Sequence, residues 1–494
     1  RGIEVDKPKP RPIVWNRYKR PFEMFDARAY PKGASVLHML RGILGDDKFH
    51  AAMSTYCRRH RHQVVETDDL RRVVEEVAYR KLDWFFKQWC FQAGSPELQV
   101  SWRWNEEDST ARVTVKQTQK VSDLVPVFRL PTTIAFTLGE KPTVFPVVLD
   151  RAEQEFVFPL KSKPDRVELD PRHFLLATLK FTKTAEEWRN QLEHAQHVLS
   201  RADAATALAE TTETDATDAS DKNVAALIAA LKREKFHALR ADVVKALGKL
   251  KGDLAQEAIL SALKDSHPTV RKTAASQLEH FEGDDVAKAL RDAWGKEAAP
   301  QARAEVLRRL AEKDEDGRDR LLEQAMLEPS YRNTVARAAL ELLVKHKHPR
   351  RREFVFLKSR RGGEEQLRST AVRSLGKLAE EDPSLIGQLR ELAEDRTFFI
   401  RRAAVDALAE VGGQEDANFL EKLMKKPTDK READRFRKAV AKIRDKKKEN
   451  PVQVADGKAV ALEDEAKRLE LKAKRLRAEA QQVRARAREQ AAQP

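Results

Sequence analysis

The sequence predicts a multidomain, mainly α-helical protein with a small β-sandwich, an α-solenoid and a C-terminal coiled-coil helix. Three observations predict this fold class. Apolar residues recur at three- and four-residue steps over most of the chain, the period changes to two after residue 97, and a helical pattern repeats between residues 185 and 447. With 494 residues, of which 41% are hydrophobic, the chain is long enough to form several cores.

Residues 1–96 begin with a Pro-rich, basic segment and continue as helices. The apolar residues of the first helix are spaced to share one face, at Ala34, Leu37, Leu40, Ile43 and Leu44. A second helix is expected to start near Thr67 or Asp68, because either side chain can cap its first turn. Gly94, followed by Ser and Pro, ends this helical region.

Residues 97–182 show the two-residue period of β-strands. Apolar side chains alternate with polar ones in two runs that the turn sequence NEEDST separates: Leu98, Val100, Trp102 and Trp104, then Ala111, Val113 and Val115. Two such runs predict a β-hairpin. Shorter runs around Phe136, Phe158 and Leu169 follow, so this region is expected to form a small β-sandwich.

Residues 185–447 carry a repeated signature, in which an apolar residue is followed by Arg and by apolar residues four and eight positions later. Five copies begin at Leu239, Val270, Ala302, Leu367 and Ile400. A sixth copy begins at Val335 and has Ala336 in place of Arg. Successive copies are 31, 32, 33, 32 and 33 residues apart, and such a regular step predicts stacked helical hairpins.

Acidic residues lie six positions before four of the signature arginines, at Glu234, Asp265, Glu297 and Asp395. In a helical hairpin these acids would sit in the turn before the second helix, where they can pair with an arginine of the same or the neighbouring unit. The pattern resembles the HEAT repeat, in which Asp and Arg ladders are common. The polar tract between Glu210 and Asn223 lengthens one step and predicts a surface loop or a hinge.

Residues 458–490 contain a seven-residue apolar repeat at Leu462, Leu469, Leu476 and Val483. An alanine follows each of these residues by four positions, which completes an a/d seam and predicts a coiled-coil tail. Because alanine buries little area, the pairing is expected to be weak. The tail is expected either to self-associate or to pack on the solenoid.

The formal net charge of +15 arises from 94 Lys and Arg against 79 Asp and Glu. Both signs are mixed along the helices, which indicates solvated faces rather than a nucleic-acid interface. Cys57 and Cys90 have no disulfide or metal spacing, which favours a reducing compartment such as the cytoplasm. No run approaches 18 apolar residues, so no membrane span is predicted.

Four stretches match the order and spacing of one known family: AYPKGASVLHMLRGILG, VETDDLRRVVEEV, LDWFFKQWCFQAGSPELQVSW and VTVKQTQ. They cover roughly residues 15–180 and resemble the later half of the catalytic region of the aminopeptidase N family of zinc peptidases, running into its β-sandwich. The resemblance implies that residues 1–96 are the helical end of a gluzincin catalytic domain. It also implies a peptidase that releases N-terminal residues from peptides, with Zn²⁺ as its cofactor.

Tyr30 is the catalytic residue that the resemblance implies, because the family's Tyr-x-Lys-Gly motif matches Tyr30, Lys32 and Gly33. In the family, this tyrosine points into the active site. When water attacks a peptide carbonyl, negative charge develops on the oxygen, and a fixed neutral phenol can donate a hydrogen bond to that oxygen.

The zinc ligands of the family are two His of H-E-x-x-H and a later Glu, and no His-Glu dipeptide occurs in these 494 residues. The family's Gly-x-Met-x-Asn substrate-binding stretch is also absent. The chain alone is therefore expected to be inactive, either as a fragment of a longer peptidase or as a natural truncation.

Two uses of the solenoid follow from this resemblance. In the family, a helical solenoid walls the active-site chamber, so residues 185–447 are expected either to restrict substrate size or to bind a protein partner. The alternative to a peptidase is a non-catalytic scaffold that binds proteins through the solenoid.

Three further clusters have simpler interpretations. His60 and His62 lie near Cys57 among arginines that disfavour a dication, so they predict a solvated basic turn. The basic runs KHKHPRRREF, KSRRGG and RDKKKEN predict solvated loops between repeats rather than phosphate contacts. One aromatic cluster is expected to be core rather than a base-stacking surface: Trp84, Phe85, Phe86, Trp89 and Phe91.

Overall fold

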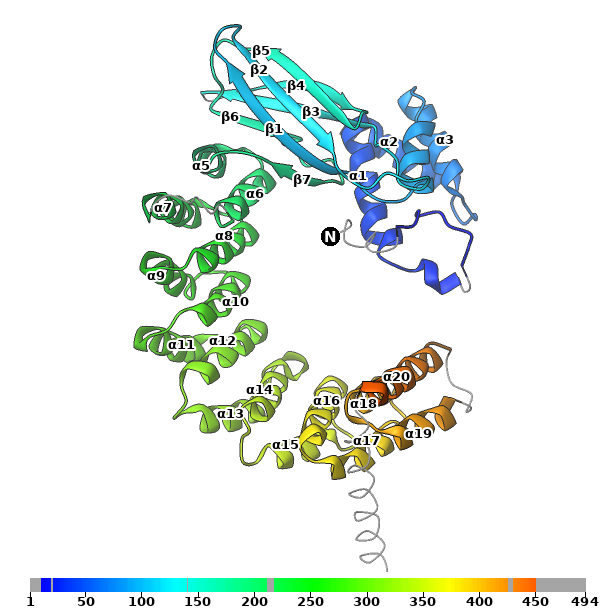
Figure 1. Ribbon diagram of the computed structural model, residues 1–494, viewed down its shortest axis with the longest axis vertical. Helices are drawn as coiled ribbons and strands as arrows, with labels where there is room; N and C mark the ends of the chain where they lie inside the picture. The colour runs from blue at the N-terminus through cyan, green and yellow to red at the C-terminus, as the bar shows by residue number, and fades with distance from the viewer. Residues whose placement is uncertain (1–9, 19–20, 140, 211–216, 425–429, 450–494) are drawn as a thin grey trace, which may run out of the picture. The chain divides into compact units, whose positions relative to one another are not determined.

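The protein is mainly helical and has two small sheets (Figure 1). The computed structural model describes residues 10–18, 21–139, 141–210, 217–424 and 430–449. The chain divides into two compact units, Arg1–Ala255 and Gln256–Pro494. The predicted fold class is confirmed in its mainly helical content, its sandwich and its repeated hairpins. The predicted coiled coil at residues 458–490 lies outside the described residues.

Short helices form the beginning of the first unit. They are η2 (Pro21–Met24), η3 (Arg28–Lys32), α1 (Gly33–Leu44), α2 (Asp46–Arg59), α3 (Thr67–Ala78), α4 (Asp83–Phe86) and η4 (Lys87–Phe91). The predicted caps of α3 are wrong, because Glu66 occupies the N-cap position. The backbone N–H of Glu66 has no partner within the helix, and it donates to the Asp69 carboxylate over 2.9 Å.

The predicted buried face of α1 is also partly wrong. Val36, Met39 and Leu40 are buried, whereas Ala34 and Leu37 are exposed. Both sets follow helical spacing, so periodicity alone could not select between them. The face is set instead by a core that α1 shares with α4, η4 and the sandwich, where Trp89 stacks on Phe128 with ring centroids 5.2 Å apart.

Seven strands form the sandwich. They are β1 (Glu97–Asn105), β2 (Thr110–Gln117), β3 (Leu130–Leu138), β4 (Lys141–Leu149), β5 (Glu153–Pro159), β6 (Arg166–Leu169) and β7 (Thr178–Phe181). One sheet has the order β5-β2-β1-β7 and the other β4-β3-β6. The predicted hairpin is confirmed, since Val100 pairs with Val115 and Trp102 with Val113 across β1 and β2. Strands β4 and β7 were not predicted.

Antiparallel helical hairpins follow the sandwich. The first unit continues with α5 (Ala185–His194), α6 (Val198–Leu208), α7 (Thr217–Arg233) and α8 (His237–Leu250), and the unit boundary falls within α9 (Asp253–Ala262). The second unit contains α10 (Pro268–Gln277), η5 (Leu278–His280), α11 (Asp284–Lys296), α12 (Pro300–Lys313), α13 (Arg318–Leu327), η6 (Tyr331–Asn333), α14 (Thr334–Lys345), α15 (Arg351–Ser359), α16 (Glu365–Glu381), η7 (Pro383–Leu385), α17 (Ile386–Leu392), α18 (Phe398–Val411), α19 (Gln414–Met424) and α20 (Lys430–Glu449).

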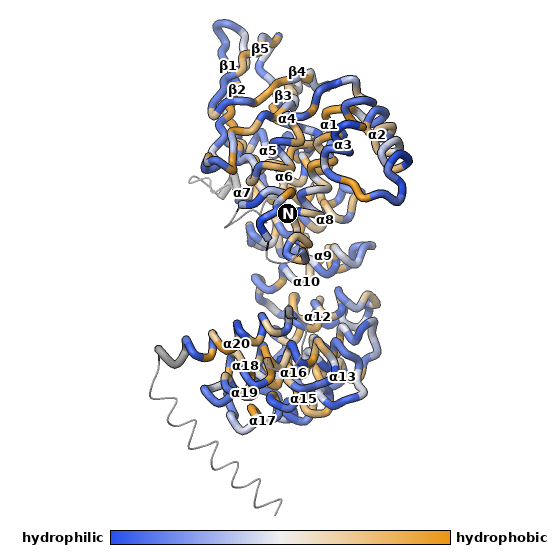
Figure 2. The backbone as a smooth tube through the Cα atoms, turned by 90° about the vertical axis from the view of Figure 1, so that its right-hand side faces the viewer, coloured by the Kyte–Doolittle hydropathy of each residue, from blue (hydrophilic) through white to orange (hydrophobic). Residues whose placement is uncertain are grey.

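The repeated signature lies on the second helix of each hairpin, from α8 to α18. All of its apolar positions are buried, and along the second unit each of these helices contacts the next, from α10 through α20. Hydrophobic and hydrophilic residues alternate along these helices in Figure 2, as amphipathic packing requires. The loop predicted between Glu210 and Asn223 is wrong in its later part, because α7 begins at Thr217 and Asn223 is buried.

The predicted acidic and basic ladder is confirmed, and it uses both kinds of pairing. Arg271 donates to the Glu297 carboxylate of the next hairpin over 2.8 Å and to the backbone carbonyl of Asp265 in its own hairpin over 2.8 Å. Arg368 donates to the Asp395 carboxylate over 2.6 Å. The same double bonding, to a backbone carbonyl of the arginine's own unit and to a carboxylate of the following unit, occurs at Arg303, Arg368 and Arg401. The hairpin that contains α14 lacks this arginine, because Ala336 occupies the position.

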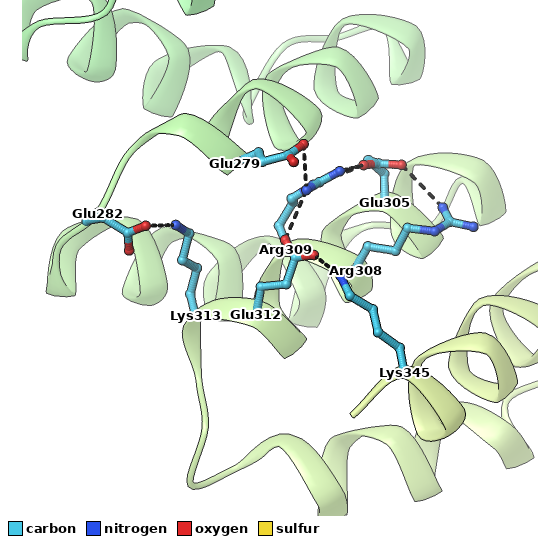
Figure 3. Close-up of polar contacts among 8 residues, drawn as sticks. All are labelled: Glu279, Glu282, Glu305, Arg308, Arg309, Glu312, Lys313 and Lys345. Atoms are coloured by element: carbon cyan, nitrogen blue, oxygen red, sulfur yellow. Dashed lines mark hydrogen bonds and ion pairs between the residues drawn. The ribbon is translucent and has the colours of Figure 1, made fainter. Parts of the chain in front are cut away.

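A second set of ion pairs links neighbouring hairpins around α12 (Figure 3). Arg309 lies 2.8 Å from Glu279 and 3.1 Å from Glu305, and Lys345 of α14 lies 2.7 Å from Glu312. The charges on this part of the second unit are therefore largely neutralised by one another. That agrees with the prediction of solvated, mixed-charge helix faces and argues against phosphate binding there.

Candidate functional site

The Tyr30 segment is a π-helical turn, η3, that leads directly into α1. Pro31 has no N–H to donate, and the N–H of Lys32 bonds to the carbonyl of Ala27, five residues earlier, over 3.1 Å. Such a single π-turn widens the helix and changes the direction in which its side chains point. Pro31 therefore accounts for the irregular backbone that carries Tyr30.

Asp26 anchors the start of this turn. Its carboxylate accepts hydrogen bonds from the backbone N–H and the guanidinium of Arg28, each over 2.8 Å, and from Arg11 over 2.6 Å. Partial burial opposes the charged form of Asp26, but the hydrogen bonds from Arg28 and Arg11 prevail and lower its pKa below the ordinary value. The turn is thus fixed ahead of Tyr30.

Lys32, the third residue of the Tyr-x-Lys-Gly motif, anchors the other end. Its side chain is fully buried, and its Nζ donates to the backbone carbonyl of Gly94 over 2.8 Å. Gly94 lies in the connection to β1 and has a left-handed backbone with φ of 82°. Lys32 therefore connects the Tyr30 turn to the base of the sandwich. The sequence did not predict this role, because lysine is rarely buried completely.

Replacing Lys32 by methionine is expected to lower the free energy of unfolding by about 1–3 kcal/mol, because the Gly94 carbonyl loses a buried donor. Chemical denaturation followed by circular dichroism measures the change. The matched control is Lys48→Met on the exposed surface of α2, which is expected to alter stability by less than about 0.5 kcal/mol. Equal stability of the two variants would show that the Lys32 contact is not a structural anchor.

Tyr30 itself is 57% exposed. Its ring meets Phe25 edge to face with centroids 4.9 Å apart, and Phe25 stacks on Phe22 at 5.5 Å. Within the described residues, no hydrogen bond engages the Tyr30 hydroxyl. The ring is therefore supported on one side, while its hydroxyl is available to another group.

A cavity of about 240 Å³ lies elsewhere in this unit, between α1, η4 and β3. Its walls include Met39, Trp84 and Trp89, and the guanidinium of Arg129 lies over the Trp84 ring at 4.8 Å. Tyr30 does not line this cavity. The aromatic cluster predicted as core is buried at Phe85, Phe86 and Trp89, whereas Phe91 is 49% exposed, which corrects the prediction for that residue.

The described residues contain no cluster of three or more His, Cys, Asp and Glu side chains suited to a metal ion. Cys57 and His62 are exposed, and His62 adopts a left-handed backbone in the turn that follows α2. The side chains present therefore do not fit the zinc centre that the resemblance implies. In the part of the chain that the structure covers, no helix is both long and apolar enough to cross a bilayer.

Comparisons with known proteins find similarity in two parts of the chain. The Peptidase family M1 domain matches residues 5–89, and HEAT repeats match residues 224–311 and 355–441. Aminopeptidase N of Escherichia coli strain K12 is 28% identical over 201 residues, which cover 37% of this chain and 22% of that protein. Aminopeptidase M1-C of rice, Oryza sativa subsp. japonica, is 37% identical over 78 residues, covering 16% of this chain and 9% of that protein.

A solved structure, the aminopeptidase A of Legionella pneumophila in complex with aspartic acid, resembles the fold. It superposes with a TM-score of 0.52 and 16% sequence identity over 84% of this chain and 52% of that chain. The present chain thus spans less than a quarter of the curated relatives named here and about half of the solved one. Residues 5–89 are thus similar to the peptidase family M1 domain, and in this chain a β-sandwich and helical hairpins similar to HEAT repeats follow that segment.

Proposed function

We propose that this chain is part of a zinc aminopeptidase that removes N-terminal residues from peptides. The observation that carries the proposal is the Tyr30 turn, which matches the peptidase family and is held at both ends, by Asp26 and by Lys32. An exposed phenol on a fixed backbone suits a hydrogen bond to a developing oxyanion. Tyr30 is the residue of this chain that we assign to that step.

The zinc ligands of such an enzyme must come from residues outside this chain, since no suitable cluster lies among the described residues and no H-E-x-x-H occurs in the sequence. We therefore assign no metal ligand here. The HEAT repeats serve substrate gating or partner binding in this proposal, and residues 458–490 serve self-association. The free thiols of Cys57 and Cys90 suit a reducing compartment, the cytoplasm.

The deciding experiment starts from the gene upstream of Arg1. We expect an in-frame H-E-x-x-H motif there, and we expect the protein that contains it to hydrolyse an aminoacyl-coumarin reporter. Treatment with 1,10-phenanthroline should abolish turnover, and added Zn²⁺ should restore it, because the metal polarises the carbonyl and activates water. The 494-residue chain alone should show no turnover and provides the control.

Absence of the H-E-x-x-H motif would support the alternative, a non-catalytic scaffold that binds proteins. In such a scaffold the peptidase-like segment would have no catalytic role. Turnover that persists in the chelator would contradict a zinc enzyme. Measuring bound zinc by atomic absorption separates a failure to load metal from a failure of catalysis.

A further inference from the structure

Three successive turns in the second unit form what we call the turn edge: residues 328–334, 360–364 and 395–399. Each turn leads into the second helix of a hairpin, α14, α16 or α18, and the third range includes the first two residues of α18, Phe398 and Phe399. Glu364 is exposed and acidic, but most of the exposed side chains in these turns are aromatic or cationic: Tyr331, Arg332, Arg360, Arg361, Arg396, Phe398 and Phe399. Tyr331 is 70% exposed and Phe399 is 52% exposed, which is unusual for large apolar rings.

Contacts between the turns make the edge continuous. The side-chain amide of Asn333 donates to the Glu364 carboxylate over 3.5 Å, which joins the first turn to the second. The guanidinium of Arg361 lies 3.7 Å from the Asp395 carboxylate, which joins the second turn to the third. The aromatic and cationic side chains therefore occupy one connected surface rather than three separate loops.

The ladder leaves this edge with unbalanced positive charge. Arg303 pairs with Glu328 at 2.5 Å, and Arg368 pairs with Asp395 at 2.6 Å, so these two carboxylates are already neutralised. In the part of the chain that the structure describes, no ion pair joins Arg332, Arg360 or Arg396 to a carboxylate. The Arg332 guanidinium lies over the Tyr331 ring at 5.2 Å, which places a cation and an aromatic face together.

We propose that the turn edge binds an acidic peptide segment of a partner protein. Carboxylates of the segment pair with Arg332, Arg360 and Arg396, and an apolar side chain packs on Tyr331 or on the Phe398–Phe399 pair, whose centroids are 5.4 Å apart. Arginine and aromatic residues are the types that dominate binding energy at protein interfaces. This partner site goes beyond the peptidase activity and does not depend on it.

Charge argues against two other possible occupants of the turn edge, the C-terminal tail of this chain and a nucleic acid. Residues 458–490 of this chain carry ten Lys and Arg against six Asp and Glu, so the chain's own tail would be repelled. A nucleic acid carries a charge at every phosphate, and the exposed Glu364, Glu365 and Glu394 lie among the arginines of the edge. A peptide, in contrast, can carry carboxylates opposite the arginines and none opposite the glutamates. A peptide therefore fits the mixed charges of the turn edge better than a nucleic acid does.

The test measures fluorescence anisotropy of a fluorescein-labelled peptide that repeats Asp-Phe-Glu, titrated with the full chain. The edge variant combines Arg332→Glu, Arg360→Glu and Arg396→Glu. We expect it to weaken binding by about tenfold or more, since each reversal replaces an attraction by a repulsion. The control variant combines Lys288→Glu, Lys296→Glu and Arg320→Glu, exposed cations of α11 and α13, and gives the same net charge.

A second variant, Tyr331→Ser with Phe399→Ser, keeps every charge and is expected to weaken binding by about threefold to tenfold through lost apolar contact. If circular dichroism shows that the charge-reversed chain does not fold, binding by this second variant provides the test of the proposal. Equal binding by the edge and control variants would overturn the proposal, as would failure of the unaltered chain to bind the peptide. Tighter binding of fluorescein-labelled oligothymidylate than of the peptide would assign the edge to nucleic acid instead.

Discussion

Replacing Arg368 by alanine is expected to lower the free energy of unfolding of the second unit by about 3–5 kcal/mol. Both partners of the Arg368–Asp395 pair are almost fully buried, with side chains 6% and 5% exposed. Removal of the guanidinium leaves the buried Asp395 carboxylate with only the exposed Arg361 at 3.7 Å as a counter-charge. It also frees the backbone carbonyl of Ser359, to which Arg368 donates over 2.8 Å. Urea denaturation followed by circular dichroism measures the loss.

Arg373→Ala on the same helix is the matched control, because Arg373 is exposed and bonds only to the hydroxyls of Ser369 and Thr370 among the described residues. It should change stability by less than about 0.5 kcal/mol. Replacing both Arg368 and Asp395 by leucine should cost less than Arg368→Ala alone, since no charge is then left unpaired. A loss below about 1 kcal/mol for Arg368→Ala would contradict a structural ladder.

The pH dependence of stability gives an independent readout of the same pair. Hydrogen bonding from Arg368 lowers the pKa of Asp395 to about 2 from its ordinary value of 3.8. A carboxyl with a depressed folded-state pKa contributes stability that is fully present above about pH 4 and is lost as the pH falls towards about 2. This contribution is about 2 kcal/mol, and Arg368→Ala should remove the part that Arg368 supplies while the hydrogen bond from Thr397 remains, so the acid limb of the stability curve should become shallower.

The solenoid was predictable because its spacing and its chemistry repeat together. A signature that recurs every 31 to 33 residues fixes which helical face is buried, and arginine after the first apolar residue predicts a partner in the adjacent turn. What the sequence left open was the choice between the same and the neighbouring unit. The structure resolves it through the two ends of the guanidinium group, one of which meets a backbone carbonyl and the other a carboxylate.

The first unit was less predictable because long-range contacts decide its local structure. Strand β4 contains Pro142 and Pro146, which argue against a strand, but β4 lies at the edge of its sheet, where proline is tolerated. The four-residue strand β7 pairs in parallel with β1 and is mostly exposed, so it carries no alternating pattern. Likewise, the burial of Lys32 depends on its hydrogen bond to Gly94, which is 62 residues away. No residue next to Lys32 in the sequence indicates that contact.

Tyr30 was identified through a family motif and not through its own environment, and the strongest prediction concerns it. In the zinc peptidase that we propose, Tyr30→Phe is expected to lower turnover of an aminoacyl reporter by on the order of 10²–10³-fold. The phenol is assigned to the oxygen that gains charge in the transition state, so kcat should fall while KM changes little. Steady-state kinetics with the reporter, alongside the zinc content of both proteins, measure the effect.

Stability separates this chemical role from a structural one. The Tyr30 ring rests on Phe25, and within the described residues its hydroxyl has no hydrogen-bond partner, so phenylalanine keeps the ring contact and should leave unfolding unchanged. Tyr79→Phe removes a hydroxyl from a side chain that is 94% exposed and should leave turnover intact. A fall of less than about threefold for Tyr30→Phe would contradict the assignment, because one donor to an oxyanion normally contributes far more than that factor. A large fall with unchanged folding, zinc content and KM is the combination that a transition-state donor produces and a packing residue does not.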